Sequence, residues 1–378
     1  MHLNVLNDIG IALDGGPSPL LDHVRCDYGS FEVEALPATK LNIAVQFVDE
    51  ATSPRDCTEV RGPVSHDDRG VLLRDSRYRV FRIDFGSARA RTWRATCDVE
   101  FDPHLFDTIL EHMIHFQLLK RGKTFCHAAA FRSGGTTALC AGSRGIGKTN
   151  LLLHALQDGA TFIADDWAVV HGGGTVQGLP KRLDLLYRDI EPFPDLFAAL
   201  PEEAAALADF IGRAAGGDFE LSQKVAQVLE SRASMQIPAT RLFGQAVDPD
   251  PGPIDQVYLL QRRQDDDGPV KFEAIDHDAL VTCLAAILEF EQSDFLLAYS
   301  VFRARTGRRV ELFDLARSGG EAVLTSALAD VPATHRVTIP ASCPPHEVYA
   351  AVANHLGGTA RTSGRERDPK TGSSSAAA

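Results

Sequence analysis

A short glycine-rich segment constrains this chain of 378 residues more than any other feature of its sequence. Residues 142–149 read Gly-Ser-Arg-Gly-Ile-Gly-Lys-Thr and fit the pattern G-x-x-x-x-G-K-[ST] at every fixed position. The apolar run before it, residues 137–141, is typical of a strand, and the leucines from residue 151 onward begin an apolar helix. A loop between such a strand and helix directs backbone N–H groups and a helix N-terminus at one point. The segment therefore predicts a phosphate-binding loop.

Each position of the loop suits a nucleoside triphosphate. Gly142 and Gly147 allow the backbone to turn back on itself, and Gly145 allows it to approach a phosphate without a Cβ atom. Lys148 brings a positive charge to the β- and γ-phosphates, and the hydroxyl of Thr149 is a ligand for Mg²⁺. We therefore expect ATP and Mg²⁺ as cofactors. The expected nucleotide contacts are Gly142, Ser143, Arg144, Gly145, Ile146, Gly147, Lys148, Thr149 and Asn150.

Two adjacent carboxylates supply the acidic partner that such a site needs. Asp165 and Asp166 follow the apolar run 161–164, and the run resumes at Trp167. Neighbouring carboxylates inside an apolar strand cost free energy unless a cation or hydrogen bonds satisfy them. One can serve Mg²⁺ while the other accepts the proton of an attacking hydroxyl. If the strand continues through the pair, the two side chains point to opposite faces and take different roles. The alternative is a plain turn between two edge strands.

These residues also carry a family resemblance. Residues 127–170, HAAAFRSGGTTALCAGSRGIGKTNLLLHALQDGATFIADDWAVV, resemble the nucleotide-binding core of HPr kinase/phosphorylase. They are even more similar to the shorter HPr-kinase-like proteins of bacterial biosynthetic clusters, such as the lasso-peptide kinases. The resemblance implies a P-loop kinase domain with the phosphoenolpyruvate-carboxykinase-like α/β fold. It further implies Asp165 as general base or acid, Asp166 and Thr149 as the residues that serve Mg²⁺, and His127 beside the transferred phosphoryl group.

The predicted function is that of an ATP-dependent kinase, with Asp165, His127 and Lys148 as catalytic residues. Asp165 would deprotonate an acceptor hydroxyl while Lys148 and Mg²⁺ neutralise the charge on the γ-phosphoryl group as it moves in line. His127 has a plainer alternative as a hydrogen-bonded core residue. The acceptor can be a Ser/Thr hydroxyl of a peptide or protein, or a small natural-product intermediate. A third alternative is an ATP-binding regulatory module, but a second carboxylate placed as a base favours the kinase.

Further charged residues are weaker candidates for the same site. Phosphoryl transfer needs additional positive charge near the γ-phosphate, and a second acidic residue can complete a metal site. Cys126 and Cys140 lie on apolar strands and are interpreted as packing residues. A basic cluster at residues 305–309 is interpreted as a solvated helix end or loop. The candidate cations are Lys181, Arg182, Arg188 and Arg241, and the candidate acids are Asp189 and Glu191.

The rest of the chain divides by pattern. Extended runs at 41–47, 78–85 and 90–101 predict a mostly antiparallel β unit that serves as scaffold or recognition module, without a titratable cluster. Asp102 and Pro103 then predict a helix start. We therefore expect a β-rich N-terminal domain at 1–101, a P-loop α/β domain at 102–358 and a disordered tail at 359–378.

Within the second domain the motif implies a parallel βαβ unit made of the strand 137–141, the helix from 148 and the strand 161–164. Later patterns predict further strands at 254–260, 270–274 and 335–339. Helical spacing predicts helices at 202–215, 221–231, 276–290, 321–328 and 347–356.

Composition limits the classes of partner and compartment. A net charge of −13 argues against duplex nucleic acid as a partner. The seven cysteines are widely spaced and include no Cys-x-x-Cys pair, which argues against a disulfide framework or structural zinc. The longest apolar stretch, near 279–290, is too short to cross a bilayer, and the first residues lack a signal-peptide pattern. We therefore expect a cytoplasmic protein without a membrane partner, and homo-oligomer formation stays open.

Overall fold

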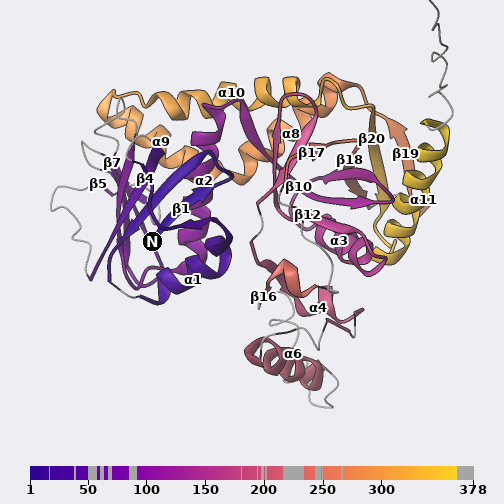
Figure 1. Cartoon of the computed structure of the whole chain (residues 1–378), viewed down its shortest axis with the longest axis horizontal. Helices are drawn as coiled ribbons and strands as arrows, with labels where there is room; N and C mark the ends of the chain where they lie inside the picture. The colour runs from indigo at the N-terminus through magenta and orange to yellow at the C-terminus, as the bar shows by residue number, and fades with distance from the viewer. Residues whose placement is uncertain are drawn as a thin grey trace, which may run out of the picture.

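The computed structural model describes residues 1–16, 18–37, 40–49, 58–59, 64–66, 70–84, 92–179, 181–193, 195–196, 200, 202–215, 234–242, 248, 250–264 and 267–363. The protein is a mixed α/β structure with two large mixed sheets (Figure 1). Helix α10 (Glu311–Leu328) runs along the top of the view and packs against helices that belong to both sheets. Among the described residues, no helix combines the length and the hydropathy needed to cross a bilayer.

The first sheet is formed by the N-terminal strands in the order β3-β1-β2-β4-β9-β8-β7-β6-β5. β4 pairs in parallel with β2 and β9, whereas the other pairs are antiparallel, so the expectation of a mostly antiparallel unit is confirmed. The strands are β1 (His2–Val5), β2 (Ile9–Asp14), β3 (Glu32–Val33), β4 (Leu41–Val48), β5 (Thr58–Glu59), β6 (Val64–His66), β7 (Gly70–Arg74), β8 (Val80–Asp84) and β9 (Trp93–Asp98).

Helix α1 (Pro19–Tyr28) interrupts this run of strands, where sequence analysis expected no helix. Its start has an ordinary capping signal: the Ser18 hydroxyl accepts a hydrogen bond from the Leu21 backbone N–H at 3.2 Å, and Pro19 occupies the first turn. A serine followed by proline is also a turn signal, which is why the pattern was ambiguous.

Two helices from outside the N-terminal segment close the core of the first sheet. α2 (Pro103–Leu119) begins as predicted, because Asp102 accepts a hydrogen bond from the Leu105 N–H at 3.0 Å. Phe106 on α2 packs between Phe47 of β4 and Phe81 of β8, with ring centroids 5.7 Å apart in both pairs. α9 (Ser293–Thr306), which sequence analysis missed, adds Phe295, Tyr299 and Phe302 to the same core.

The second sheet has the order β17-β14-β13-β10-β11-β18-β20-β19, with β12 also paired to β10. β11 and β12 are each antiparallel to β10, so the two strands of the expected βαβ unit are parallel but have β10 between them. β11, β18 and β20 are parallel neighbours. The strands are β10 (Lys123–Ser133), β11 (Thr136–Ala141), β12 (Thr161–Ala164), β13 (Trp167–His171), β14 (Thr175–Gly178), β17 (Gly252–Pro253), β18 (Gln256–Arg263), β19 (Lys271–Ala274) and β20 (Ala333–Pro340).

Helices cover both faces of this sheet, and alternating residues of β10 divide between two cores. Ala129 and Phe131 pack with α3 (Lys148–Gln157), α11 (Pro345–Ser363) and the small hairpin of β15 (Leu183–Leu186) and β16 (Ser234–Ile237). Ala128 and Ala130 pack with α8 (His277–Glu291) and α10 on the other face. Helices α4 (Tyr187–Ile190) and α6 (Glu202–Ala215) lie beside the hairpin (Figure 1).

The predicted helices outside the motif have mixed outcomes. Those at 202–215 and 276–290 are confirmed as α6 and α8. The helix predicted at 321–328 is the second half of α10, and the one at 347–356 lies inside α11. α11 continues to Ser363, so the start of the expected disordered tail is helical instead. The helix predicted at 221–231 and residues 364–378 lie outside the described residues.

The packing of α2 on the first sheet predicts the effect of one substitution. Phe106→Ala removes a side chain with no exposed surface, and it should lower the free energy of unfolding by about 3–5 kcal/mol. Phe290→Ala is the matched control, because Phe290 is 70% exposed, and it should change that free energy by less than about 0.5 kcal/mol. Urea unfolding followed by circular dichroism measures both. Equal losses in the two variants would contradict this assignment of the core.

Candidate functional site

The glycine-rich loop lies between β11 and α3, and its glycines differ in what they require. Gly145 and Gly147 have φ angles of 76° and 106°, which glycine adopts at little cost. A Cβ atom at Gly142 would lie 3.1 Å from the Leu260 carbonyl oxygen on β18 and 3.0 Å from Ile146. The turning role expected of Gly147 is confirmed, and Gly145 shares it. The role of Gly142 is corrected, because it is a position of close approach to β18, and the approach of Gly145 to a phosphate stays a prediction.

Lys148 is the first residue of α3 and reaches back across the loop. Its Nζ donates hydrogen bonds to the carbonyl oxygens of Gly142 and Ser143, at 3.0 and 3.1 Å. The side chain is buried, and burial lowers the pKa of Lys148 against the opposing charges of Asp166 and Asp165. Gly147, at the N-cap, brings no capping side chain. A buried ammonium and a helix N-terminus thus converge on one loop, the arrangement that favours an anion.

Thr149 connects the loop to the carboxylate pair. Its hydroxyl donates to the two carboxylate oxygens of Asp165, which lie 3.0 and 3.2 Å away. The next residue, Asn150, donates from its side-chain amide to Asp189 at 2.8 Å, and Asp189 also accepts from the Leu186 backbone N–H. Asp189 therefore fixes α4 against α3 through Asn150. At the end of the loop, the Thr149 hydroxyl and the Asp165 carboxylate thus bring together oxygen atoms of the kind that bind Mg²⁺.

The backbone turns sharply at the carboxylate pair. Asp166 has a φ angle of 61°, and the Trp167 N–H donates to the Asp165 carbonyl at 2.7 Å across it. The Asp166 carbonyl still accepts from the Ala128 N–H of β10 at 3.0 Å. The pair is thus neither a continuous strand nor a turn between edge strands, because β12 and β13 both pair with β10 on either side of it. A left-handed aspartate between two strands is a strained position of the kind found at functional sites.

His127 on β10 lies between two carboxylates. Its Nε2 is 3.6 Å from Asp166 Oδ1, and its Nδ1 is 3.2 Å from Glu291 Oε1. Its ring also contacts the Trp167 ring, with centroids 5.2 Å apart. Sequence analysis missed Glu291, which is the last residue of α8. In the sequence, Glu291 is recognisable only as an acidic residue at the end of a helix. The packing of α8 against β10 is what brings it to His127.

The two aspartates of the pair differ in proton affinity. Burial and the neighbouring charge of Asp166 raise the pKa of Asp165 to about 7, despite the Thr149 hydrogen bond and the Lys148 charge. For Asp166 burial acts in the same direction, but the hydrogen bond from His127 and the charges of Lys181 and Lys148 hold its pKa below the usual range. The pKa of Asp165 is raised first by burial and then by the charge of its neighbour, the two effects that make a carboxylate hold its proton.

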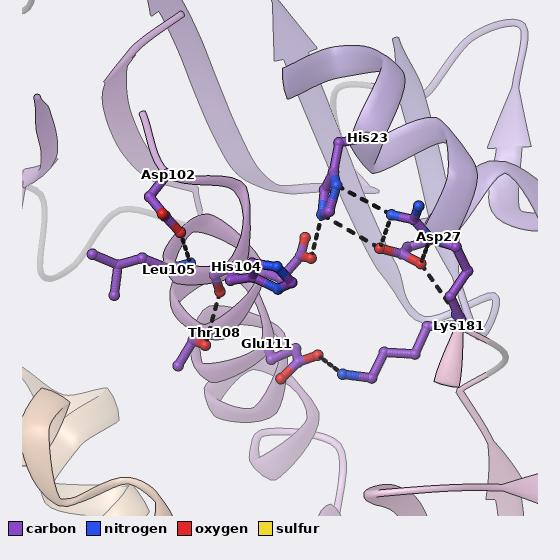
Figure 2. A network of polar contacts seen from close by, with 10 residues as sticks. His23, Asp27, Asp102, His104, Leu105, Thr108, Glu111 and Lys181 are labelled. Atoms are coloured by element: carbon purple, nitrogen blue, oxygen red, sulfur yellow. Dashed lines mark hydrogen bonds and ion pairs between the residues drawn. The ribbon is translucent and has the colours of Figure 1, made fainter. Parts of the chain in front are cut away.

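A network of polar contacts joins the N-terminal helices to Trp167 and to the segment after β14, and Figure 2 shows its part around Asp27, Glu111 and Lys181. Lys181 donates to Glu111 Oε1 on α2, and Trp167 Nε1 donates to Glu111 Oε2 at 2.8 Å. Arg182 donates to both oxygens of Asp27 on α1, at 2.7 and 3.0 Å. Lys181 and Arg182 are both candidate cations for the site. Lys181 shares Glu111 with Trp167, the residue after the Asp pair, whereas Arg182 pairs with Asp27 and joins its segment to α1.

A titratable cluster lies at α1 and α2, contrary to the expectation for the N-terminal segment. His23 Nε2 is 2.6 Å from Asp107 Oδ2 and 3.6 Å from Asp27 Oδ2. Their ligand atoms are close enough to share a cation. Arg182 already provides one, because its guanidinium contacts Asp27 and lies 3.1 Å from His23 Nδ1. We interpret the cluster as an ion-pair network that joins the two parts of the protein.

The remaining candidates lie away from the loop contacts described above. Cys126 and Cys140 are buried, and burial raises the pKa of both thiols, in agreement with a packing role. The charged candidates on the surface are all exposed: Arg188, Glu191, Arg241, Arg305, Arg308 and Arg309. No protein-family model matches the chain, and no curated protein is similar enough to match it.

The raised pKa of Asp165 predicts a pH effect on stability. Between about pH 4 and 7 the folded protein holds a proton that the unfolded chain has released, so ionisation of Asp165 destabilises the fold as the pH rises. Asp165→Asn removes this contribution. The variant should therefore melt above the wild type at pH 5 and by a clearly larger margin at pH 8, without metal or nucleotide.

The control is Asp184→Asn, because Asp184 is exposed on β15 and its substitution should shift the melting temperature equally at both pH values. Differential scanning calorimetry at pH 5 and pH 8 measures all three proteins. A melting-temperature difference between wild type and Asp165→Asn that does not change with pH would contradict the assignment.

Proposed function

We propose that this protein is an ATP-dependent kinase that transfers the γ-phosphoryl group to a hydroxyl acceptor. The observation that carries the proposal is the contact between the Thr149 hydroxyl and the buried carboxylate of Asp165, at the end of a loop that Lys148 spans. A phosphate-binding loop joined in this way to an acidic strand end is the arrangement that phosphoryl transfer on a Mg²⁺–nucleotide requires.

The residues around the loop fit Mg²⁺ and a triphosphate. Oxygen ligands from a hydroxyl and a carboxylate suit Mg²⁺, and Thr149 with Asp165 would hold it. The bound ion would neutralise charge on the phosphates. The backbone of the loop would bind the phosphate oxygens, and Lys148 would exchange the carbonyl oxygens of Gly142 and Ser143 for them.

The contacts favour an exchange of the two aspartate roles expected from the sequence. The sequence expectation gives the base to Asp165 and the metal to Asp166. Asp165 instead contacts Thr149, whereas Asp166 is 43% exposed and faces His127. A cation beside Thr149 would lower the pKa of Asp165, so that this carboxylate would bind the cation in its ionised form. In this assignment Asp166 Oδ1 takes the proton of the acceptor hydroxyl, and His127 Nε2, 3.6 Å away, stabilises the Asp166 carboxylate as its neighbour.

The acceptor follows from the resemblance and not from the site. The similarity of residues 127–170 to HPr-kinase-like proteins of biosynthetic clusters supports a Ser/Thr hydroxyl of a peptide or protein. A search for a phosphate-sized mass increment, after incubation of candidate acceptors with Mg·ATP and the protein, tests this choice. An increment on a small natural-product intermediate would identify the small-molecule alternative. Nucleotide binding without transfer to any acceptor would instead favour a regulatory module.

Loss of the loop lysine should weaken nucleotide binding. Lys148→Ala removes the charge that faces the β- and γ-phosphates, and the variant should bind Mg·ATP at least about tenfold more weakly, as expected for a charge-assisted contact. Isothermal titration calorimetry measures the affinity, and the control is Lys123→Ala, whose ammonium pairs with Asp8 on the first sheet instead. Unchanged Mg·ATP affinity in Lys148→Ala would remove the basis of the proposal.

Separate substitution of the two aspartates decides their roles. Asp165→Asn should raise the Mg²⁺ concentration needed for ATP binding, because a metal ligand has lost its charge. Asp166→Asn should leave that concentration unchanged while transfer falls by about 10²–10⁴-fold, the scale of a general base. Phosphate release with water as the acceptor measures transfer without a known substrate. The reverse pattern in the two variants would restore the roles expected from the sequence.

A further inference from the structure

One buried carboxylate of the N-terminal helices reaches the second sheet. Glu111 lies on α2, whose inward neighbours Leu110, Met113 and Ile114 pack in the core of the first sheet. Glu111 is only 6% exposed, and each of its carboxylate oxygens accepts a hydrogen bond from the second part of the protein. A buried carboxylate costs free energy unless it is paired, so this position is not explained by packing alone.

One donor to Glu111 is next to the carboxylate pair in the chain, and the other is a lysine whose charge acts on Asp166. Trp167 directly follows Asp166 in the chain, and its indole N–H fixes Glu111 beside the turn. Lys181 donates to the other oxygen, and its side chain is 19% exposed, so a solvent-accessible edge remains. Although burial opposes it, the charges of Glu111 and Asp166 raise the pKa of Lys181, so its ammonium stays charged. Lys148 and Lys181 thus both act on Asp166, from two different elements.

We propose that Glu111 is a positioning residue for phosphoryl transfer, which holds the Lys181 ammonium beside Asp166 to stabilise the charge on the moving phosphoryl group. The inference rests on the proposed kinase function. In the transfer step the bond from the γ-phosphorus to the β–γ bridging oxygen breaks, and ADP leaves with the electron pair. A bond from the acceptor oxygen to phosphorus forms, and the acceptor proton passes to Asp166. Lys181 remains protonated throughout and acts by its charge.

This role makes the site composite. Lys148 comes from the loop and Lys181 from the segment after β14, but the residue that orients Lys181 belongs to the helix that completes the N-terminal core. Glu291 stands in the same relation to His127, from the end of α8. The N-terminal part of the chain therefore contributes to the chemistry as well as to folding.

Aluminium fluoride with Mg·ADP provides a test that needs no known acceptor, because the fluoride complex occupies the position of the transferred phosphoryl group. Glu111→Gln keeps a carbonyl oxygen as an acceptor for Trp167 but removes the charge that holds Lys181. We expect wild-type affinity for Mg·ADP and about 10–100-fold weaker binding of the fluoride complex, the usual cost of losing an outer-shell partner. Lys181→Met should show the same loss, and the double variant should lose no more than Lys181→Met alone.

The matched control is Asp27→Asn. Asp27 pairs with Arg182, the residue next to Lys181, and joins the same two parts of the protein without contacting Lys181 in the network described above. It should lower the melting temperature without weakening the fluoride complex. If Glu111→Gln does not fold, Glu111→Asp replaces it, since the shorter side chain keeps the charge but withdraws it from Lys181.

Three outcomes would overturn the inference while the kinase proposal stands. They are wild-type binding of the fluoride complex by the Glu111 variant, an equal loss in Asp27→Asn, and additive losses in the Glu111/Lys181 double variant. A wild-type protein that binds Mg·ADP but gains no affinity from aluminium fluoride would overturn it too. A wild-type protein that does not bind Mg·ADP would instead refute the proposed function itself.

Discussion

The pairing of β10 with three other strands holds the candidate site together. β11, which leads into the glycine-rich loop, pairs along one edge of β10, and β12 and β13 pair in succession along the other. The register of β10 shifts between Ala130 and Phe131, near the point where the opposite strand is interrupted. The Asp pair fills that interruption, and His127 projects from β10 beside it. Loop, carboxylates and imidazole are therefore placed by one hydrogen-bonded strand rather than by the loop alone.

Charge balance is the second constraint on this region. The region combines three carboxylates, Asp165, Asp166 and Glu111, with Lys148 and Lys181, and of these five residues Asp165, Glu111 and Lys148 are buried. Each carboxylate would be costly alone, but every one of them has a cation or a hydrogen-bond donor within contact distance or electrostatic reach. The negative charge of Asp165 is the least well compensated, since the pKa of this carboxyl group is raised. The Thr149 hydroxyl contacts the same carboxyl group. A divalent cation there would complete the balance of charge.

The cores explain why the N-terminal segment cannot be treated as an independent appendage. α2 and α9 bury their aromatic side chains against the first sheet, yet α2 is followed directly by β10 and α9 directly follows α8. Asp27 with Arg182, and Glu111 with Lys181, add ion pairs between the same two parts. The domain limits expected at residues 101 and 358 remain a prediction. The core of the first sheet contains α1 from before residue 101 and α2 and α9 from beyond it.

What the sequence determined by itself is the local chemistry. The glycine-rich motif, the strand before it, the helix after it and the N-cap of α2 all depend on neighbours within a few residues, and short-range patterns encode them directly. Tertiary structure alone decided which distant side chains complete the site. The packing of α8 brings Glu291 to His127, and the packing of α2 brings Glu111 to Lys181, one of four cations that the sequence offered as candidates. The left-handed turn at Asp166 arises where two strands share one partner. Such contacts depend on pairing between residues far apart in the chain, which no local periodicity records.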